Sequence, residues 1–193
     1  MPRHISAFPS FTTRIDVAPV GLMSVSRSFE LGGSALAANG NAAMAVVATH
    51  LGASAGALAW MLVEWRRYGK PSALGVITGM VAGLGTITPA SGFVSPAGAL
   101  AIGFIAGIVC FFATQLLKRV LHIDDSLDVS PVHGVGGVVG TLLTGVFAAR
   151  ALGGVGFTLQ PGIASQLGIQ ALGIGAVALW CGGFTWILLK ALD

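Results

Sequence analysis

One stretch of this sequence decides the expected fold: it reads Asp128-Val129-Ser130-Pro131-Val132-His133-Gly134-Val135-Gly136-Gly137. The stretch places one imidazole near the start of an apolar, glycine-rich span that is long enough to cross a bilayer. A titratable ring in hydrocarbon is costly, so by default such a histidine marks a pathway for a small polar solute or a proton. The stretch therefore predicts a membrane-spanning helix with a functional side chain at His133.

The composition of the whole chain favours a membrane protein. Its 193 residues are 54% hydrophobic and 9% charged, whereas an ordinary soluble domain carries about 25% charged residues. So few charges cannot cover a water-facing surface, and we expect lipid to surround the chain. The 29 glycines are about twice the usual share, which indicates helices packed backbone to backbone.

The charges and cysteines exclude several classes of protein. The net charge of +3 is small, and the basic residues among the apolar runs sit in short clusters at the ends of those runs, which is not the pattern of a nucleic-acid-binding protein. Cys110 and Cys181 lie inside apolar runs and form no CxxC pair, so we expect buried, inert thiols with no metal site, disulfide framework or cofactor. Asp124 and Asp125 are adjacent in a loop and do not form a catalytic acid–base pair.

Five apolar spans predict an all-α fold, namely a polytopic transmembrane helix bundle. The spans cover roughly residues 38–63, 74–87, 97–117, 129–149 and 162–189. A spanning helix needs about 20 residues, with a range of about 17–25. The second span is therefore at the short end, unless its flanks are partly helical too.

Basic residues predict the orientation of these spans. They gather after the first, third and fifth spans, where the chain carries Arg66, Arg67, Lys70, Lys118, Arg119 and Lys190. With five alternating helices these three places lie on one side, and the opposite side has only Arg150. The positive-inside rule then puts both loops and the C-terminus in the cytoplasm of a multi-pass protein of the cell membrane.

Glycines at four-residue spacing form stripes along three of the spans. They are Gly75, Gly79 and Gly83 on the second span, Gly103 and Gly107 on the third, and Gly136 and Gly140 on the fourth. Helices approach closely along such faces. We expect tight packing within one bundle, with contacts between subunits as the alternative.

Residues 1–32 differ from the rest of the chain. The first 28 residues hold three arginines and a single acid, and they contain no apolar stretch like a signal-peptide core. A targeting peptide is one interpretation; we favour a leader that is disordered or spurious. Residues 33–193 are then one transmembrane domain.

Four ordered motifs carry a resemblance to a known family. They are Gly33-Ser34-Ala35-Leu36-Ala37-Ala38-Asn39-Gly40, Glu64-Trp65 with Gly69-Lys70-Pro71-Ser72, Ile87-Thr88-Pro89-Ala90-Ser91-Gly92-Phe93-Val94, and Asp124-Asp125-Ser126-Leu127-Asp128-Val129 with Val132-His133-Gly134-Val135-Gly136-Gly137. From Gly33 onward the chain resembles the ammonium transporter family (Amt/MEP/Rh). The resemblance covers only the second half of the family's eleven-helix fold.

The resemblance implies a transporter rather than an enzyme. Members bind ammonium outside, strip a proton and pass ammonia through a hydrophobic pore, and they are typically homotrimers whose cytoplasmic loops meet PII-type regulators. The family's first five helices supply an aromatic lid and one of two facing pore histidines, and no part of this chain matches them. We therefore expect a truncated form that does not conduct on its own. The alternative is a non-transporting membrane module that assembles with full-length subunits or with a separately encoded N-terminal half.

The resemblance also implies the site residues. His133 matches the second of the paired pore histidines. Ser34 matches the serine of the external ammonium recruitment site, with a small turn residue as the alternative. Asp128 matches an acid near the cytoplasmic pore exit, although a carboxylate at a helix start also stabilises the helix dipole. Val129, next to it, belongs to the same predicted pore lining. Pro131 suits a first helical turn, so the helix is expected to start near it.

Overall fold

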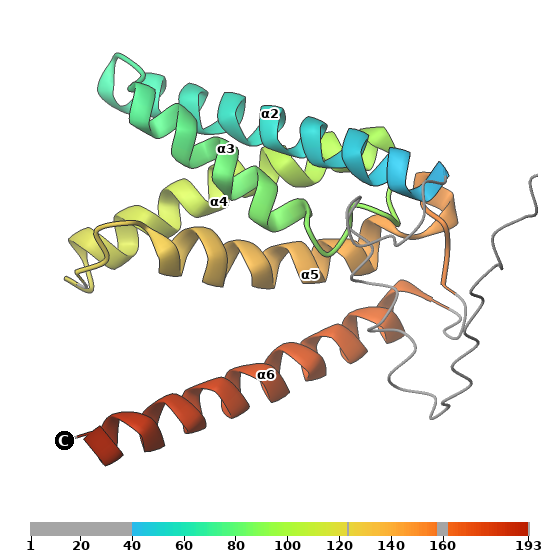
Figure 1. Cartoon of the computed structure of the whole chain (residues 1–193). Coiled ribbons are helices and arrows are strands. Elements are labelled where there is room, and N and C mark those ends of the chain that lie inside the picture. The colour runs from blue at the N-terminus through green and yellow to red at the C-terminus, as the bar shows by residue number, and fades with distance from the viewer. Residues whose placement is uncertain (1–39, 123, 158–161, 193) are drawn as a thin grey trace, which may run out of the picture.

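The computed structural model describes residues 40–122, 124–157 and 162–192, and every regular element in that part of the chain is a helix (Figure 1). The elements in order are α2 (Gly40–Tyr68), α3 (Ala73–Ile87), α4 (Pro96–Arg119), the π-helix η2 (Ser130–Val135), α5 (Gly136–Phe147), the 3-10 turn η3 (Arg150–Leu152) and α6 (Ile163–Leu192). The predicted all-α bundle is confirmed. Residues 1–32 and Ser34 lie outside the described residues.

All but one of the long helices in the described part of the chain have the length that a membrane requires. Four of them are long and apolar enough to cross a bilayer: residues 43–68, 96–119, 130–147 and 163–192. Helix α3 has 15 residues, so it is about 22 Å long. Its N-terminal flank does not extend it, because Ser72 caps the helix by accepting the N–H of Gly75 at 2.9 Å. The second span is thus the short one, as the sequence indicated.

The glycine stripes bring the helices into backbone contact inside the bundle. A Cβ on Gly107 of α4 would lie 2.5 Å from the carbonyl oxygen of Gly56 in α2, and a Cβ on Gly56 would lie 2.8 Å from Cα of Gly83 in α3. Real Cβ atoms do not approach that closely, so alanine does not fit at these places. On α5, Gly140 lies against the main chain of Thr86. The prediction of tight packing within one bundle is confirmed.

Apolar side chains of α2, α3, α4 and η2 form two buried clusters, in which alanines pack beside larger residues. One buried cluster gathers around Ile87 and Ile102, and a second around Trp60, Cys110 and Phe111. Val132, from the π-helix, is buried in the second cluster. The start of the fourth span is therefore anchored in the same core as the first three.

Helix α6 stands apart from this core. None of its residues is buried, and Figure 1 shows it diverging from α5 toward the C-terminus. It contacts the bundle near its start, where Leu167 and Gln170 lie beside Gly145 of α5. Cys181 is consequently exposed, whereas Cys110 is buried. The expectation of two buried thiols is wrong for Cys181, because no helix in the described part of the chain packs over that stretch of α6.

The basic helix ends gather at one end of the bundle. The α2–α3 turn, the α4–η2 connection and the end of α6 lie together in Figure 1. Basic residues occupy the last turns there: Arg66, Arg67, Lys118, Arg119 and Lys190. The predicted charge asymmetry is therefore a property of the folded chain.

Candidate pore face

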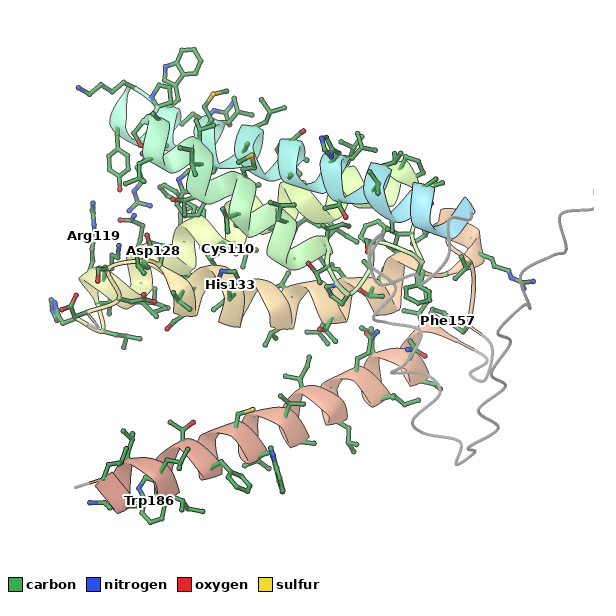
Figure 2. All side chains as sticks on the ribbon, in the orientation of Figure 1. Cys110, Arg119, Asp128, His133, Phe157 and Trp186 are labelled. Carbon is green, nitrogen blue, oxygen red and sulfur yellow. The ribbon has the colours of Figure 1, made fainter. Side chains whose placement is uncertain are left out.

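His133 lies on the π-helix with its ring exposed, whereas Pro131 and Val132 beside it are buried. The residue that faces it from the neighbouring helix α3 is Gly85. A Cβ built on Gly85 would lie 3.7 Å from His133 Nδ1. Figure 2 labels His133 on the ribbon that leads into α5, and α3 lies above it in the picture. The imidazole thus rests against a helix backbone on one side and is open on the other.

The first turn of this helix has all its backbone donors accounted for. Asp125 accepts the N–H of Val129 on Oδ1 at 3.0 Å and the N–H of Ser130 on Oδ2 at 2.7 Å. Pro131 has no N–H to satisfy. The N–H of Val132 donates to the carbonyl of Asp128 at 3.0 Å. Proline therefore sits where a helix tolerates it, and the start of the helix near Pro131 is confirmed.

Asp125, which the sequence analysis left without a role, is the capping residue. The N–H groups of Ser130 and Val129 hold the pKa of its carboxyl below the ordinary value, because they stabilise the charged form. The carboxylate lies in the loop outside the spanning segment. Its place in the sequence, five residues before Ser130-Pro131, is the only hint that the chain gives of this cap.

Asp128 forms an ion pair rather than a cap. Its Oδ1 lies 2.8 Å from Nζ of Lys118 at the end of α4. Its backbone has a φ of +55°, in the left-handed region that Asp tolerates better than most residues. Asp125, rather than Asp128, therefore caps the helix. Asp128 ties η2 to α4, and its place near the pore exit stays a prediction.

The remaining predicted site residue and the other histidines lie at separate places. Val129 donates its N–H to Asp125, and its side chain is exposed. His50 is exposed on α2, and His122 follows α4 with a φ of +52°. Within the described ranges, no group of three metal-ligating side chains comes together. The described residues thus bring His133 together with no second imidazole.

Polar side-chain atoms of α3 and α4 lie beside Gly136, where η2 meets α5. A Cβ on Gly136 would lie 2.9 Å from Thr86 Oγ1 and 3.3 Å from Cys110 Sγ. The hydroxyls of Thr86 and Thr114 are buried with no hydrogen-bond partner among the described residues. Close approach of α5 to α3 and α4 therefore depends on the missing side chain of Gly136.

Comparison with known proteins identifies the family. The family model described as Ammonium Transporter Family matches residues 29–193. The chain belongs to the ammonium transporter family. Ammonium transporter 1 of Dictyostelium discoideum is 41% identical over 162 residues, which cover 83% of this chain and 35% of that protein. The ammonium transporter of Aquifex aeolicus is 45% identical over 160 residues, covering 83% of this chain and 38% of the relative.

Solved structures agree with this assignment. The Sensor Amt Protein matches with a TM-score of 0.77 at 32% identity, covering 84% of this chain and 39% of its own. Candida albicans Mep2 matches with a TM-score of 0.75 at 42% identity, and the match covers 84% of this chain and 37% of the Mep2 chain. The ammonium transporter resemblance is therefore confirmed, and the family is one of transporters rather than enzymes. The chain spans about two fifths of the length of these relatives.

Proposed function

We propose that this chain forms one wall of a transmembrane ammonia pathway and that His133 lines it. The observation that carries the proposal is the exposed imidazole beside Gly85, on a spanning helix of an ammonium transporter family member. A neutral imidazole offers one donor and one acceptor. It can therefore hydrogen-bond ammonia along a dry passage, and it can relay a proton.

The opposite wall of the pathway is proposed to come from a polypeptide segment equivalent to the family's first five helices. From the family resemblance we expect a second histidine there, and none of the described residues supplies one against His133. Without that wall, the exposed ring and the exposed faces of α3, α5 and α6 meet lipid. An open half-bundle encloses no lumen. The 193-residue chain alone is therefore expected not to conduct.

A liposome assay tests this proposal. Purified chain is reconstituted alone, or together with a polypeptide carrying the five N-terminal helices of a family member, and ammonium-driven pH change inside the vesicles is recorded. We expect the rate of protein-free liposomes from the chain alone and a faster rate from the pair. Flux from the chain alone that is abolished by His133→Ala would refute the prediction that the chain does not conduct on its own.

The two ends of the pathway follow from the same proposal. Ser34 is assigned to the external recruitment site on the strength of its motif. Asp128 and Val129 are assigned to the inner mouth, since they immediately precede the helix that carries His133. The ion pair between Lys118 and Asp128 leaves that carboxylate partly exposed, at 18%. A partly solvated acid of this kind suits the exit from a pore.

The setting of the protein is also part of the proposal. Residues 33–193 are taken as one transmembrane unit in the cell membrane, with the C-terminus in the cytoplasm. The clustering of basic helix ends at one end of the bundle supports that orientation. A homotrimer, and a PII-type regulator docking on the loops near Arg66 and Arg119, are proposed from the family resemblance alone.

A second candidate function, a non-transporting interaction module, is favoured by α6. Its apolar side chains are exposed along most of the helix, with Leu172 at 76% and Leu179 at 79%. Such a helix can pack against full-length subunits or against a separately encoded N-terminal half. Co-purification with such a chain, without flux from the assembled pair in liposomes, would favour this function over transport.

A further inference from the structure

The π-helix that carries His133 lies between two fixed points. On its C-terminal side, Gly136 and Gly140 press α5 against Thr86 of α3, so α5 cannot rotate without a clash. On its N-terminal side, both oxygens of Asp125 bind consecutive backbone N–H groups. Both ends of the six-residue segment Ser130–Val135 are therefore held by contacts to other parts of the chain.

The wide turn between these points accommodates an extra residue. The N–H of Gly136 donates to the carbonyl of Pro131, five residues back, and is shared with that of His133. Such a π-turn is rarer and less favourable than an ordinary α-turn and persists where other contacts hold it. The turn therefore needs a restraint at its N-terminal end, and the cap by Asp125 is positioned to supply it.

We infer that Asp125 is a positioning residue. By capping Val129 and Ser130 it keeps the π-turn from relaxing to an α-turn, and so it keeps the His133 ring against the backbone of α3 at Gly85. Relaxation of the π-turn to an α-turn shifts the register by one residue. One residue is about 100° of rotation around a helix. Because α5 is fixed, the rotation falls on the residues before Gly136, and it carries the ring away from α3.

The side chain of Val132 packs in the core, and two polar contacts also lie near the helix start, but none of these three holds the N–H groups that precede Pro131. The Lys118–Asp128 ion pair joins a lysine side chain that is 40% exposed to an aspartate side chain that is 18% exposed; it ties Asp128 to α4 but binds neither of those N–H groups. The N–H of Val132 bonds to the carbonyl of Asp128, and this four-residue step persists in an ordinary α-turn. Only the carboxylate of Asp125 binds the two donors that precede Pro131.

The inference concerns the direction of the ring, so it can be tested in the 193-residue chain without any flux. Its consequence for conduction rests on the proposed function, but the contact between His133 and Gly85 does not. The probe is the NMR contact between the His133 ring and the Hα atoms of Gly85, recorded in lipid nanodiscs. The contact between Gly140 and Thr86 reports in the same spectra that the bundle is intact.

Three variants define the experiment. Asp125→Ala removes both acceptors, Asp125→Asn keeps one carbonyl oxygen, and Asp124→Asn is the matched control on the neighbouring acid. We expect the ring contact with Gly85 to be lost in Asp125→Ala, weakened in Asp125→Asn and unchanged in Asp124→Asn. The contact between Gly140 and Thr86 is expected to remain in all three.

Two results would overturn the inference. One is an unchanged ring contact in Asp125→Ala although the amide protons of Val129 and Ser130 have lost their protection from exchange. The other is an equal loss of the ring contact in Asp124→Asn. If Asp125→Ala fails to fold, which loss of the contact between Gly140 and Thr86 would reveal, Asp125→Asn decides the matter by the same criteria.

Discussion

Replacing Gly140 by alanine tests whether α5 is held against α3 by direct backbone contact. A Cβ at this position would lie 2.9 Å from the carbonyl carbon of Thr86 and 3.1 Å from its Cα, with the carbonyl oxygen closer still. Ordinary contacts of a Cβ lie between 3.4 and 4 Å, so α5 must move away from α3 by at least half an ångström (roughly the difference between these distances). Overpacking of this kind costs about 1–3 kcal/mol.

The same helix offers a matched control in Gly137. A Cβ there would meet no atom within 4 Å, and alanine is favoured over glycine inside a helix by about 1 kcal/mol. We therefore expect Gly140→Ala to lower the free energy of unfolding by about 1–3 kcal/mol and Gly137→Ala to leave it unchanged or raise it slightly. Unfolding in lipid bicelles, followed by circular dichroism, measures both variants. Equal effects of the two substitutions would show that α5 does not contact α3 as described.

Three further predictions follow from the helix ends and the cysteines. Glu64→Ala removes the acceptor of both the N–H and the hydroxyl of Ser72, so we expect a loss of about 0.5–1.5 kcal/mol and faster amide exchange at the start of α3. Because backbone hydrogen bonds lower the pKa of Asp125, its cap is fully formed above the unfolded-state pKa of about 3.9 and is lost as the pH falls through the lower folded-state pKa. The amide shifts of the two capped residues should follow that acid transition, and Asp125→Asn should abolish it; a transition that persists in the variant would assign it to another group. Cys181 is exposed and Cys110 is buried, so Cys110→Trp should lower the free energy of unfolding by about 1–3 kcal/mol through overpacking and Cys181→Trp should leave it nearly unchanged; equal effects in bicelle unfolding would contradict the exposed position of α6.

The helical spans could be predicted from the sequence because each depends on local composition. Runs of apolar residues with basic ends gave α2, α4 and α6 to within a few residues. Four-residue glycine spacing gave the close helix contacts, since the absence of a side chain is visible in the sequence itself. The proline at the start of the fourth span likewise marked the first turn of η2.

The cap and the wide turn near His133 could not be predicted, because they depend on the path of the loop. His122 and Asp128 both have positive φ values, and these bends bring Asp125 beneath the helix start. Nothing in the periodicity of the sequence distinguishes Asp125 from Asp124. The π-turn is also invisible to periodicity, because its extra residue is accommodated only by the packing of α5 on α3.

The separation of α6 from the bundle was also not predicted. An apolar span indicates burial in lipid or protein without saying which. Its 30 residues contact the described bundle only near Gln170, so its exposed surface is available to lipid or to another polypeptide. The open side of the His133 ring is likewise available to lipid or to another polypeptide.

The most direct test of the account is the effect of one imidazole on flux in the assembled pair of polypeptides. His133→Ala and His50→Ala each remove one exposed histidine from a spanning helix, so His50→Ala is the matched control. The account predicts that ammonium-driven flux through liposomes containing the pair falls to the protein-free rate with His133→Ala and is unaffected by His50→Ala. Undiminished flux with His133→Ala, in a pair that still assembles, would contradict the claim that this ring lines the pathway.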